Sequence, residues 1–194
     1  MRLMSIPKKH PFIFGVFITT MKTCSVDLAV QYYIEKKNSV DWKRNMTFGC
    51  FGMFYQGMWQ YYLFNKIMPK ITPNTLTFIN KNLTDKIRDK KGIKGVLLQN
   101  FIENGINNPL LFFPCFYTIK ESINREKICY KSIYYGLKTY KKNFWDDLKA
   151  CWSIWIPAQT INFAFSPIHL RVPYVAFVSA VWTAYVSYTR GGKN

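Results

Sequence analysis

The chain has 194 residues, which suits one domain, and it carries 27 basic and 10 acidic residues for a net charge of +17. Hydrophobic residues make up 49% and aromatic residues 18%, yet the mean hydropathy is only −0.09, which by itself argues against a membrane protein. The five cysteines are far apart and form no Cys-x-x-Cys pair, so neither a zinc site nor a disulfide framework is indicated.

Charge is segregated along the chain, and this segregation outweighs the mean hydropathy. No Asp, Glu, Lys or Arg lies between Ala150 and Leu170, and none between Val172 and Thr189. About 20 uncharged residues cross a bilayer core, so such windows predict membrane helices. The basic residues flank the uncharged windows, which favours anionic lipid headgroups over nucleic acid as their partner. A solvated basic surface without a partner is the alternative.

The first predicted span begins at Pro11, where a missing amide hydrogen suits a helix start, and runs to about Tyr33. Lys22 and Asp27 interrupt it. Because they are five residues apart and share a helix face poorly, we expect Asp27 to meet another helix. Residues 35–44 form a polar, basic loop.

The second predicted span, Asn45–Asn65, is free of charge and ends at Pro69. Gly49 and Gly52 lie one turn apart and allow another helix to come close. The basic segment that follows, residues 72–94, is predicted as an amphipathic helix with one apolar stripe. The stripe consists of Leu76, Ile79, Leu83 and Ile87.

The third predicted span runs from Gly95 to Ile119 and contains Glu103. A second basic amphipathic connector, residues 120–149, leads to a fourth span headed by Asp146 and Asp147, because carboxylates are favoured at helix N-termini. A tight turn over residues 167–173 joins the last two spans. The sequence therefore predicts an all-α fold: a polytopic membrane bundle of four to five transmembrane helices with amphipathic connecting helices.

The C-terminal stretch resembles the signature of the Mpv-seventeen and twenty-two-kilodalton peroxisomal membrane protein family, small integral proteins of mitochondria and peroxisomes. The residues that carry the resemblance are Trp155, Gln159, Asn162, Phe163, Pro167, Arg171, Trp182 and Ser187. One departure is Pro157, which stands two residues before Gln159 where the family places it three before. The resemblance implies a single membrane domain over residues 1–194 in the mitochondrial inner membrane or, alternatively, the peroxisomal membrane. The strong positive charge favours the cardiolipin-rich inner membrane.

Seven polar residues fall inside the predicted spans: Lys22, Asp27, Gln31, Glu103, Asn104, Gln159 and Asn162. An isolated charge there costs roughly 2.5–3.5 kcal/mol, so these side chains must face one another or a wet cavity. One interpretation is a polar pathway for solutes or ions, and the other is hydrogen bonding between helices. The second is favoured for Gln159 and Asn162, and both stay open for the charged residues.

Two arginines are predicted to contact lipid headgroups. Arg44 precedes the second span, at a position where the family tends to place an arginine. Arg171 separates the last two spans, where its guanidinium can either bind a lipid phosphate in bidentate fashion or cap carbonyls at a helix end.

No motif for catalysis or metal binding stands out, because His10 and His169 each lie beside a proline without a nearby cysteine or acid at ligand spacing. We therefore predict a non-catalytic accessory subunit of a larger inner-membrane complex, such as a respiratory-chain or ATP synthase assembly. Its expected partners are membrane lipids and other inner-membrane subunits, not nucleic acid. Its expected bound group is a structural anionic phospholipid, with cardiolipin as the candidate, and no other cofactor. The alternative is a small-solute or ion pore that maintains metabolite levels and membrane potential.

Overall fold

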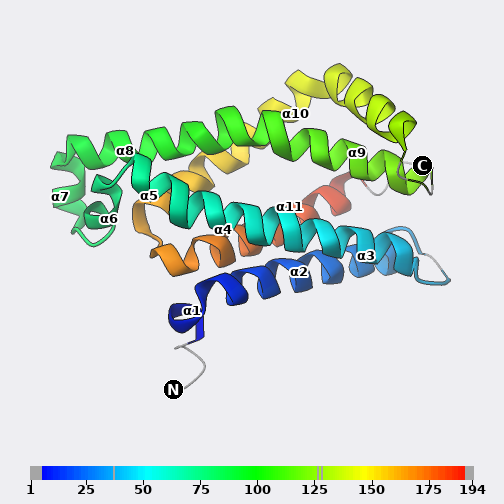
Figure 1. Ribbon diagram of the computed structural model, residues 1–194, viewed down its shortest axis with the longest axis horizontal. Coiled ribbons are helices and arrows are strands. Elements are labelled where there is room, and N and C mark those ends of the chain that lie inside the picture. The colour runs from blue at the N-terminus through cyan, green and yellow to red at the C-terminus, as the bar shows by residue number, and fades with distance from the viewer. Residues whose placement is uncertain (1–5, 37, 126, 128, 191–194) are drawn as a thin grey trace. The chain divides into compact units, whose positions relative to one another are not determined.

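The computed structural model describes residues 6–36, 38–125, 127 and 129–190, and side chains as far as Val181. Every regular element in these residues is a helix (Figure 1), which confirms the all-α prediction. The chain divides into two compact units, Met1–Ile71 with Ser166–Asn194 and Thr72–Phe165. Two compact units can belong to one domain, so the single domain over residues 1–194 stays a prediction.

The first unit opens with α1 (Ile6–Lys9) and α2 (Pro11–Ala29), which continues as the π-helical segment η2 (Val30–Ile34). The predicted helix start at Pro11 is confirmed. Over Pro11–Ile34 the helix is long and apolar enough to cross a membrane, and it is the one such helix among the described residues. Ile168–Val181 is a shorter apolar helix. The count of four to five membrane helices stays a prediction.

The second arm of this unit is an uninterrupted helix. It consists of α3 (Trp42–Phe51), η3 (Gly52–Trp59), α4 (Gln60–Tyr62), η4 (Leu63–Ile67) and α5 (Met68–Ile71). The predicted end at Pro69 is therefore wrong, because this proline lies inside α5.

Glycines bring the second arm against α2, as predicted for Gly49 and Gly52. A Cβ on Gly52 would lie 2.6 Å from the Thr23 hydroxyl, and one on Gly49 would lie 2.8 Å from the Cys24 sulfur. Contacts this short leave no room for a larger residue, so the two glycines fix the approach of the helices.

The last helix of the unit is α11 (Arg171–Arg190), which follows the short 3₁₀ helix η6 (Ile168–Leu170). It packs on α2, where a Cβ on Gly15 would lie 3.2 Å from Val172. The predicted turn is shorter than expected, because Pro173 already belongs to the first turn of α11, where a proline costs no hydrogen bond.

The second unit begins with two short helices, α6 (Asn74–Phe78) and α7 (Leu83–Arg88), instead of one amphipathic helix. The predicted continuous apolar stripe is wrong, because the break between Phe78 and Leu83 separates its first two residues from its last two. Leu83 and Ile87 are 67% and 75% exposed. The buried side chains here are Thr75, Phe78 and Lys86. The Lys86 ammonium donates to the carbonyls of Ile79 and Lys81, at 2.8 and 3.0 Å, and thereby closes the turn between the two helices.

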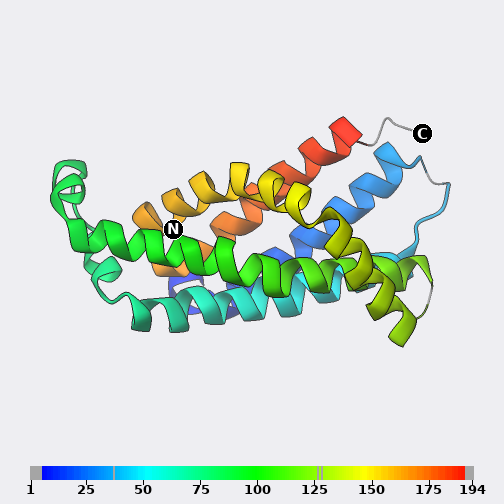
Figure 2. The same cartoon turned by 90° about the horizontal axis from the view of Figure 1, so that it is seen from above.

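The rest of the unit is two long helical rods. One consists of α8 (Lys90–Phe101), the π-helical η5 (Ile102–Phe112) and α9 (Phe113–Asn124), and the other is α10 (Tyr130–Phe165). Asp146 and Asp147 lie in the middle of α10, so the prediction that they head a helix is wrong. Asp147 instead accepts a hydrogen bond from the Tyr117 hydroxyl of α9. The helix α10 continues without a break on both sides of this residue. Figure 2 shows that α10 is bent, so its two halves run in different directions.

Candidate functional site: two buried polar clusters

The first cluster surrounds Asp27 in the first unit and is called the Asp27 cluster below. The carboxylate is buried and lies 2.9 Å from the Arg44 guanidinium. It also accepts hydrogen bonds from the amides of Gln31, at 2.8 Å, and Asn45, at 3.0 Å. The expectation that Asp27 meets another helix is confirmed, because Arg44 and Asn45 belong to α3.

The Asp27 cluster also orders the loop before α3. The side-chain oxygen of Gln31 accepts from the backbone amide of Asp41 at 2.7 Å, and the Asp41 carboxylate caps α3 by accepting from the amide of Arg44 at 3.0 Å. A second guanidinium nitrogen of Arg44, Nη1, donates to both oxygens of the Glu35 carboxylate, at 2.7 and 2.8 Å. Arg44 thus neutralises two carboxylates of its own unit, while its contact with lipid stays a prediction.

Lys22 belongs to a separate contact on α2. Its ammonium lies 2.6 Å from the side-chain oxygen of Gln56 in η3, and the Thr23 hydroxyl lies 3.5 Å from the same oxygen. Lys22 and Asp27 therefore bind different partners on the second arm, as their spacing on the helix predicts.

Arg171 is fully buried, and its guanidinium donates to the backbone carbonyl of Phe64 at 3.2 Å. The surrounding backbone explains this contact. In η4 the amide of Met68 donates to the carbonyl of Leu63, five residues earlier. Continuing this pattern, the carbonyl of Phe64 would accept from residue 69, but Pro69 has no amide hydrogen. Arg171 donates to this carbonyl within the helix and not at its end, so its contact with a lipid phosphate stays a prediction.

The second cluster runs along α8 and η5 in the second unit. We call Asn100, Asn104 and Asn108 the amide ladder, because they are spaced by four residues and each side-chain amide donates to the one before it. The distances are 2.7 Å from Asn104 to Asn100 and 3.1 Å from Asn108 to Asn104. Beside the ladder, Asn107 donates to the buried Glu103 carboxylate at 3.0 Å.

The amide ladder ties this rod to α10. Asn100 donates to the carbonyl of Ile156 at 2.8 Å and to the Thr160 hydroxyl at 2.6 Å. In the other direction, the indole of Trp152 donates to the carbonyl of Asn104 at 2.9 Å. The ladder is thus a hydrogen-bonded contact between two helices, and its amides are oriented by fixed backbone acceptors.

The family-signature residues lie partly in this unit. Gln159 and Asn162 are buried and bonded to each other at 3.0 Å, and Phe163 is fully buried beside them in sequence. Trp155 is half-buried and Pro167 is exposed at the start of the turn. Trp182 and Ser187 belong to α11, but their side chains lie outside the described part of the chain. The proposed roles of these residues stay predictions.

Several buried polar residues did not stand out from the sequence. They include Asn45 of the Asp27 cluster and Asn100, Asn107 and Asn108 of the second cluster. The four-residue spacing of the three ladder asparagines was an available signal, since such residues share one helix face. The role of Asn45 has no such local signal, because its partner lies 18 residues earlier on another helix.

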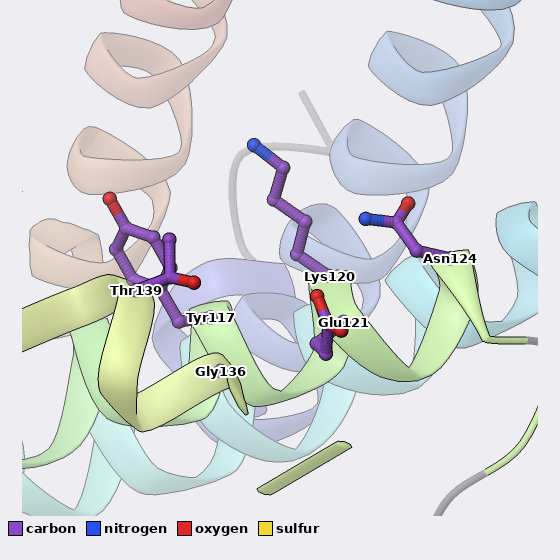
Figure 3. A pocket seen from close by; sticks show the side chains of 6 residues that line it. All are labelled: Tyr117, Lys120, Glu121, Asn124, Gly136 and Thr139. Carbon is purple, nitrogen blue, oxygen red and sulfur yellow. The ribbon is translucent and has the colours of Figure 1, made fainter. Parts of the chain in front are cut away.

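A cavity of about 240 Å³ lies between α9 and α10 (Figure 3), and none of its lining residues belongs to the amide ladder. It is lined by Tyr117, Lys120, Glu121, Asn124, Gly136 and Thr139. Lys120 and Glu121 carry opposite charges, and Glu121 pairs with Arg125 at 2.6 Å, so the lining favours neither sign of ligand. Among the described residues, no group of three or more His, Cys, Asp or Glu side chains is placed to hold a metal ion.

Within the described residues the chain is an all-helical protein in which Pro11–Ile34 is long and apolar enough to cross a membrane. Residues 130–187 match the Mpv17 / PMP22 family. The resemblance read from the C-terminal signature is confirmed over this part of the chain, which contains the signature residues.

Three proteins illustrate the relationship. The chain is 32% identical to an uncharacterized protein of Schizosaccharomyces pombe over 58% of its own length and 48% of that protein. It is 22% identical to an Mpv17-like protein of Xenopus laevis over 97% of this chain and 81% of that one. It is 36% identical to peroxisomal membrane protein 2 of Bos taurus over 24% of each chain. The match therefore spans about half of the Schizosaccharomyces pombe relative. No solved structure matches significantly.

Proposed function

We propose that this protein is a non-catalytic structural or accessory subunit of a larger assembly in the mitochondrial inner membrane. The observation that carries the proposal is that the buried Asp27 carboxylate is paired with side chains of its own unit. A buried charge that lines a solute pathway would have to face water. Asp27 instead meets Arg44, Gln31 and Asn45 within its own unit, which is what a group that holds helices together requires.

The outward faces support this role. Large apolar side chains are exposed in both units, among them Phe17 at 58%, Phe54 at 57% and Phe101 at 61%. Exposed apolar surface on this scale needs lipid or protein to cover it. Membrane lipids and neighbouring inner-membrane subunits are the partners with suitable surfaces.

The net charge of +17 supports the choice of membrane. Basic segments near a bilayer are attracted to anionic lipids, and the inner membrane is rich in cardiolipin, which we propose as the bound phospholipid. The peroxisomal membrane is the alternative location, and the name of the Bos taurus relative supports it.

The test is native electrophoresis of mitochondria that express the tagged full chain and are solubilised in mild detergent. We expect the chain to migrate with an assembly far larger than its own 22.9 kDa. Migration as a single chain, or fractionation with peroxisomes, would contradict the proposal. Isolated assemblies should also retain cardiolipin on lipid analysis.

A second candidate function is a small-solute or ion pore, and Glu103 favours it. This carboxylate lies inside a predicted membrane span, where it accepts a hydrogen bond from Asn107 at 3.0 Å, and ionisable groups inside membrane spans commonly mark ion or proton pathways. If the chain is a pore, purified protein in planar bilayers should conduct ions, and Glu103→Gln should change the conductance or ion selectivity. Glu121→Gln is the matched control, because that carboxylate lies on α9 and pairs with Arg125. A silent bilayer would rule this candidate out.

A further inference from the structure

The first half of α10, residues 130–149, contacts the rest of its unit through a narrow stripe. Ser132, Gly136 and Tyr140 are buried and spaced by four residues. A Cβ on Gly136 would lie 2.8 Å from the carbonyl of Tyr117, and the Tyr140 ring stacks on Phe113 at 5.6 Å. The helix therefore lies directly on α9, and most of its circumference is left uncovered within this unit.

The uncovered surface is divided into two sectors. At 3.6 residues per turn, the sector next to the buried stripe on one side is apolar and aromatic. Its apolar members are Tyr130, Ile133, Tyr134, Leu137 and Trp145, which are 79%, 43%, 51%, 41% and 64% exposed. The exposed Lys141 lies among them, and its long side chain can extend to the headgroup layer. The sector beyond it is basic, with Lys131, Lys138, Lys142 and Lys149 exposed, and the exposed Tyr135 lies at its far edge. An apolar sector with a row of lysines beside it is the arrangement of helices that lie in a membrane interface.

The charge of this segment selects the kind of surface that it fits. Residues 130–145 contain four lysines and no acidic residue: Lys131, Lys138, Lys141 and Lys142. The first acids along the helix are Asp146 and Asp147, and the second of these is already engaged by Tyr117. The complementary surface must therefore be anionic, with an apolar layer directly beneath the charge.

The bend in α10 makes this arrangement compatible with a membrane position for the rest of the helix (Figure 2). Because the two halves run in different directions, the basic half can lie along a membrane surface while the uncharged half enters the bilayer.

We propose that residues 130–149 of α10 dock on an anionic phospholipid surface, with the aromatic sector in the acyl-headgroup boundary and the lysines among the headgroups. The proposal rests on the membrane setting of the proposed function and names one lipid-binding surface within it. It does not depend on membership in a larger assembly, so the two can fail independently.

The test places an environment-sensitive fluorophore on the aromatic sector. The full chain carries Tyr134→Cys, labelled with NBD, and serine replaces Cys24, Cys50, Cys115 and Cys129, while the buried Cys151 remains. The protein is placed in nanodiscs, whose two faces are both open to reagents. The discs contain phosphatidylcholine alone or with about 30 mol% phosphatidylglycerol, a composition chosen to give a clear surface charge. Circular dichroism and gel filtration establish that the labelled chain is folded.

In anionic discs we expect a blue-shifted NBD emission and a several-fold slower reduction by dithionite than in neutral discs. A lysine near an anionic surface strengthens attraction about fivefold, which corresponds to ~1 kcal/mol. Changing Lys131, Lys138 and Lys142 to Gln should therefore weaken docking on the order of 100-fold and remove the difference between the two lipids. The matched control changes the exposed Lys90, Lys91 and Lys94 to Gln, which removes the same charge and should leave the difference intact.

A second label position reports on geometry. NBD on Thr139→Cys, an exposed residue on the other side of the helix, should stay accessible to dithionite in both lipids. Equal reduction rates at residue 134 in the two lipids would overturn the proposal, whether both rates are fast or both are slow. Protection that occurs only in the native assembly, and in neither disc, would identify an acidic protein as the occupant and would also overturn it.

Discussion

The two units bury polar groups in different ways. In the first, Asp27 and Arg44 form an ion pair between neighbouring helices, with one carboxylate serving three partners. In the second, the amide ladder is neutral and follows one helix before it reaches α10. Removing one member of a buried ion pair is costly, because the remaining residue keeps a charge in an apolar environment without its partner. A row of amides shares its bonds among many groups. The first unit should therefore be more sensitive to single substitutions.

The largest effect should follow from Asp27→Ala. The change leaves Arg44 without its buried partner, and Gln31 and Asn45 without their acceptor, so we expect a loss of about 3–5 kcal/mol in unfolding free energy. Denaturation of the detergent-solubilised chain measures it. The exposed Asp85→Ala is the control and should change stability by less than about 0.5 kcal/mol. A small loss at Asp27 would mean that the existing pair with Glu35 is enough to neutralise Arg44.

Asn104→Ala tests the ladder and should cost less, about 1–2 kcal/mol, because it leaves one donor and one acceptor of neighbouring amides unsatisfied. The same denaturation assay applies. Asn143→Ala, a half-buried asparagine that donates to the Tyr117 hydroxyl at 3.3 Å, is the comparison outside the ladder. If Asn104→Ala costs as much as Asp27→Ala, the proposed difference between the units is wrong.

The hydrogen bond between Arg171 and the carbonyl of Phe64 should contribute about 1 kcal/mol to the unfolding free energy, and a pair of substitutions tests this. Pro69→Ala restores the amide hydrogen that this helix lacks, so the carbonyl of Phe64 gains a backbone donor. Arg171→Gln should therefore destabilise the wild-type chain more than it destabilises the Pro69→Ala chain. A double-mutant cycle measures this coupling. Strict additivity would show that Arg171 does not replace the missing donor.

The smallest effect concerns pH. The side-chain hydrogen bond from Lys81 and the backbone amide of Gly92 hold the pKa of the Asp89 carboxyl below its ordinary value of 3.8. Since the folded pKa is lowered, the stabilisation is complete above pH 3.8 and is lost as the pH falls through the lower folded value. Asp89→Asn should flatten this acid dependence at the start of α8. Amide hydrogen exchange of residues 90–94 over that range measures it, with Asp85→Asn as the control.

Sequence patterns found the helices more reliably than their breaks. Pro69 and the pair Asp146 and Asp147 predicted boundaries, because each is unfavourable or unusual within a lone helix. Tertiary contacts remove both boundaries. Arg171 donates to the carbonyl of Phe64 in the turn before Pro69, and the Tyr117 hydroxyl donates to Asp147 in the middle of α10.

Composition and spacing alone determined the all-helical class, the helix start at Pro11, the close approach at Gly49 and Gly52, and the need for Asp27 to find a partner on another helix. These are local properties, set by dihedral limits, side-chain size and the cost of burying charge. Only the tertiary structure decided that Arg44 meets Asp27, that Asn100 binds the carbonyl of Ile156, and that Arg171 binds the carbonyl of Phe64. The last contact joins residues 107 positions apart. A contact between residues so far apart in the sequence depends on how the helices pack. No periodicity in the sequence encodes it.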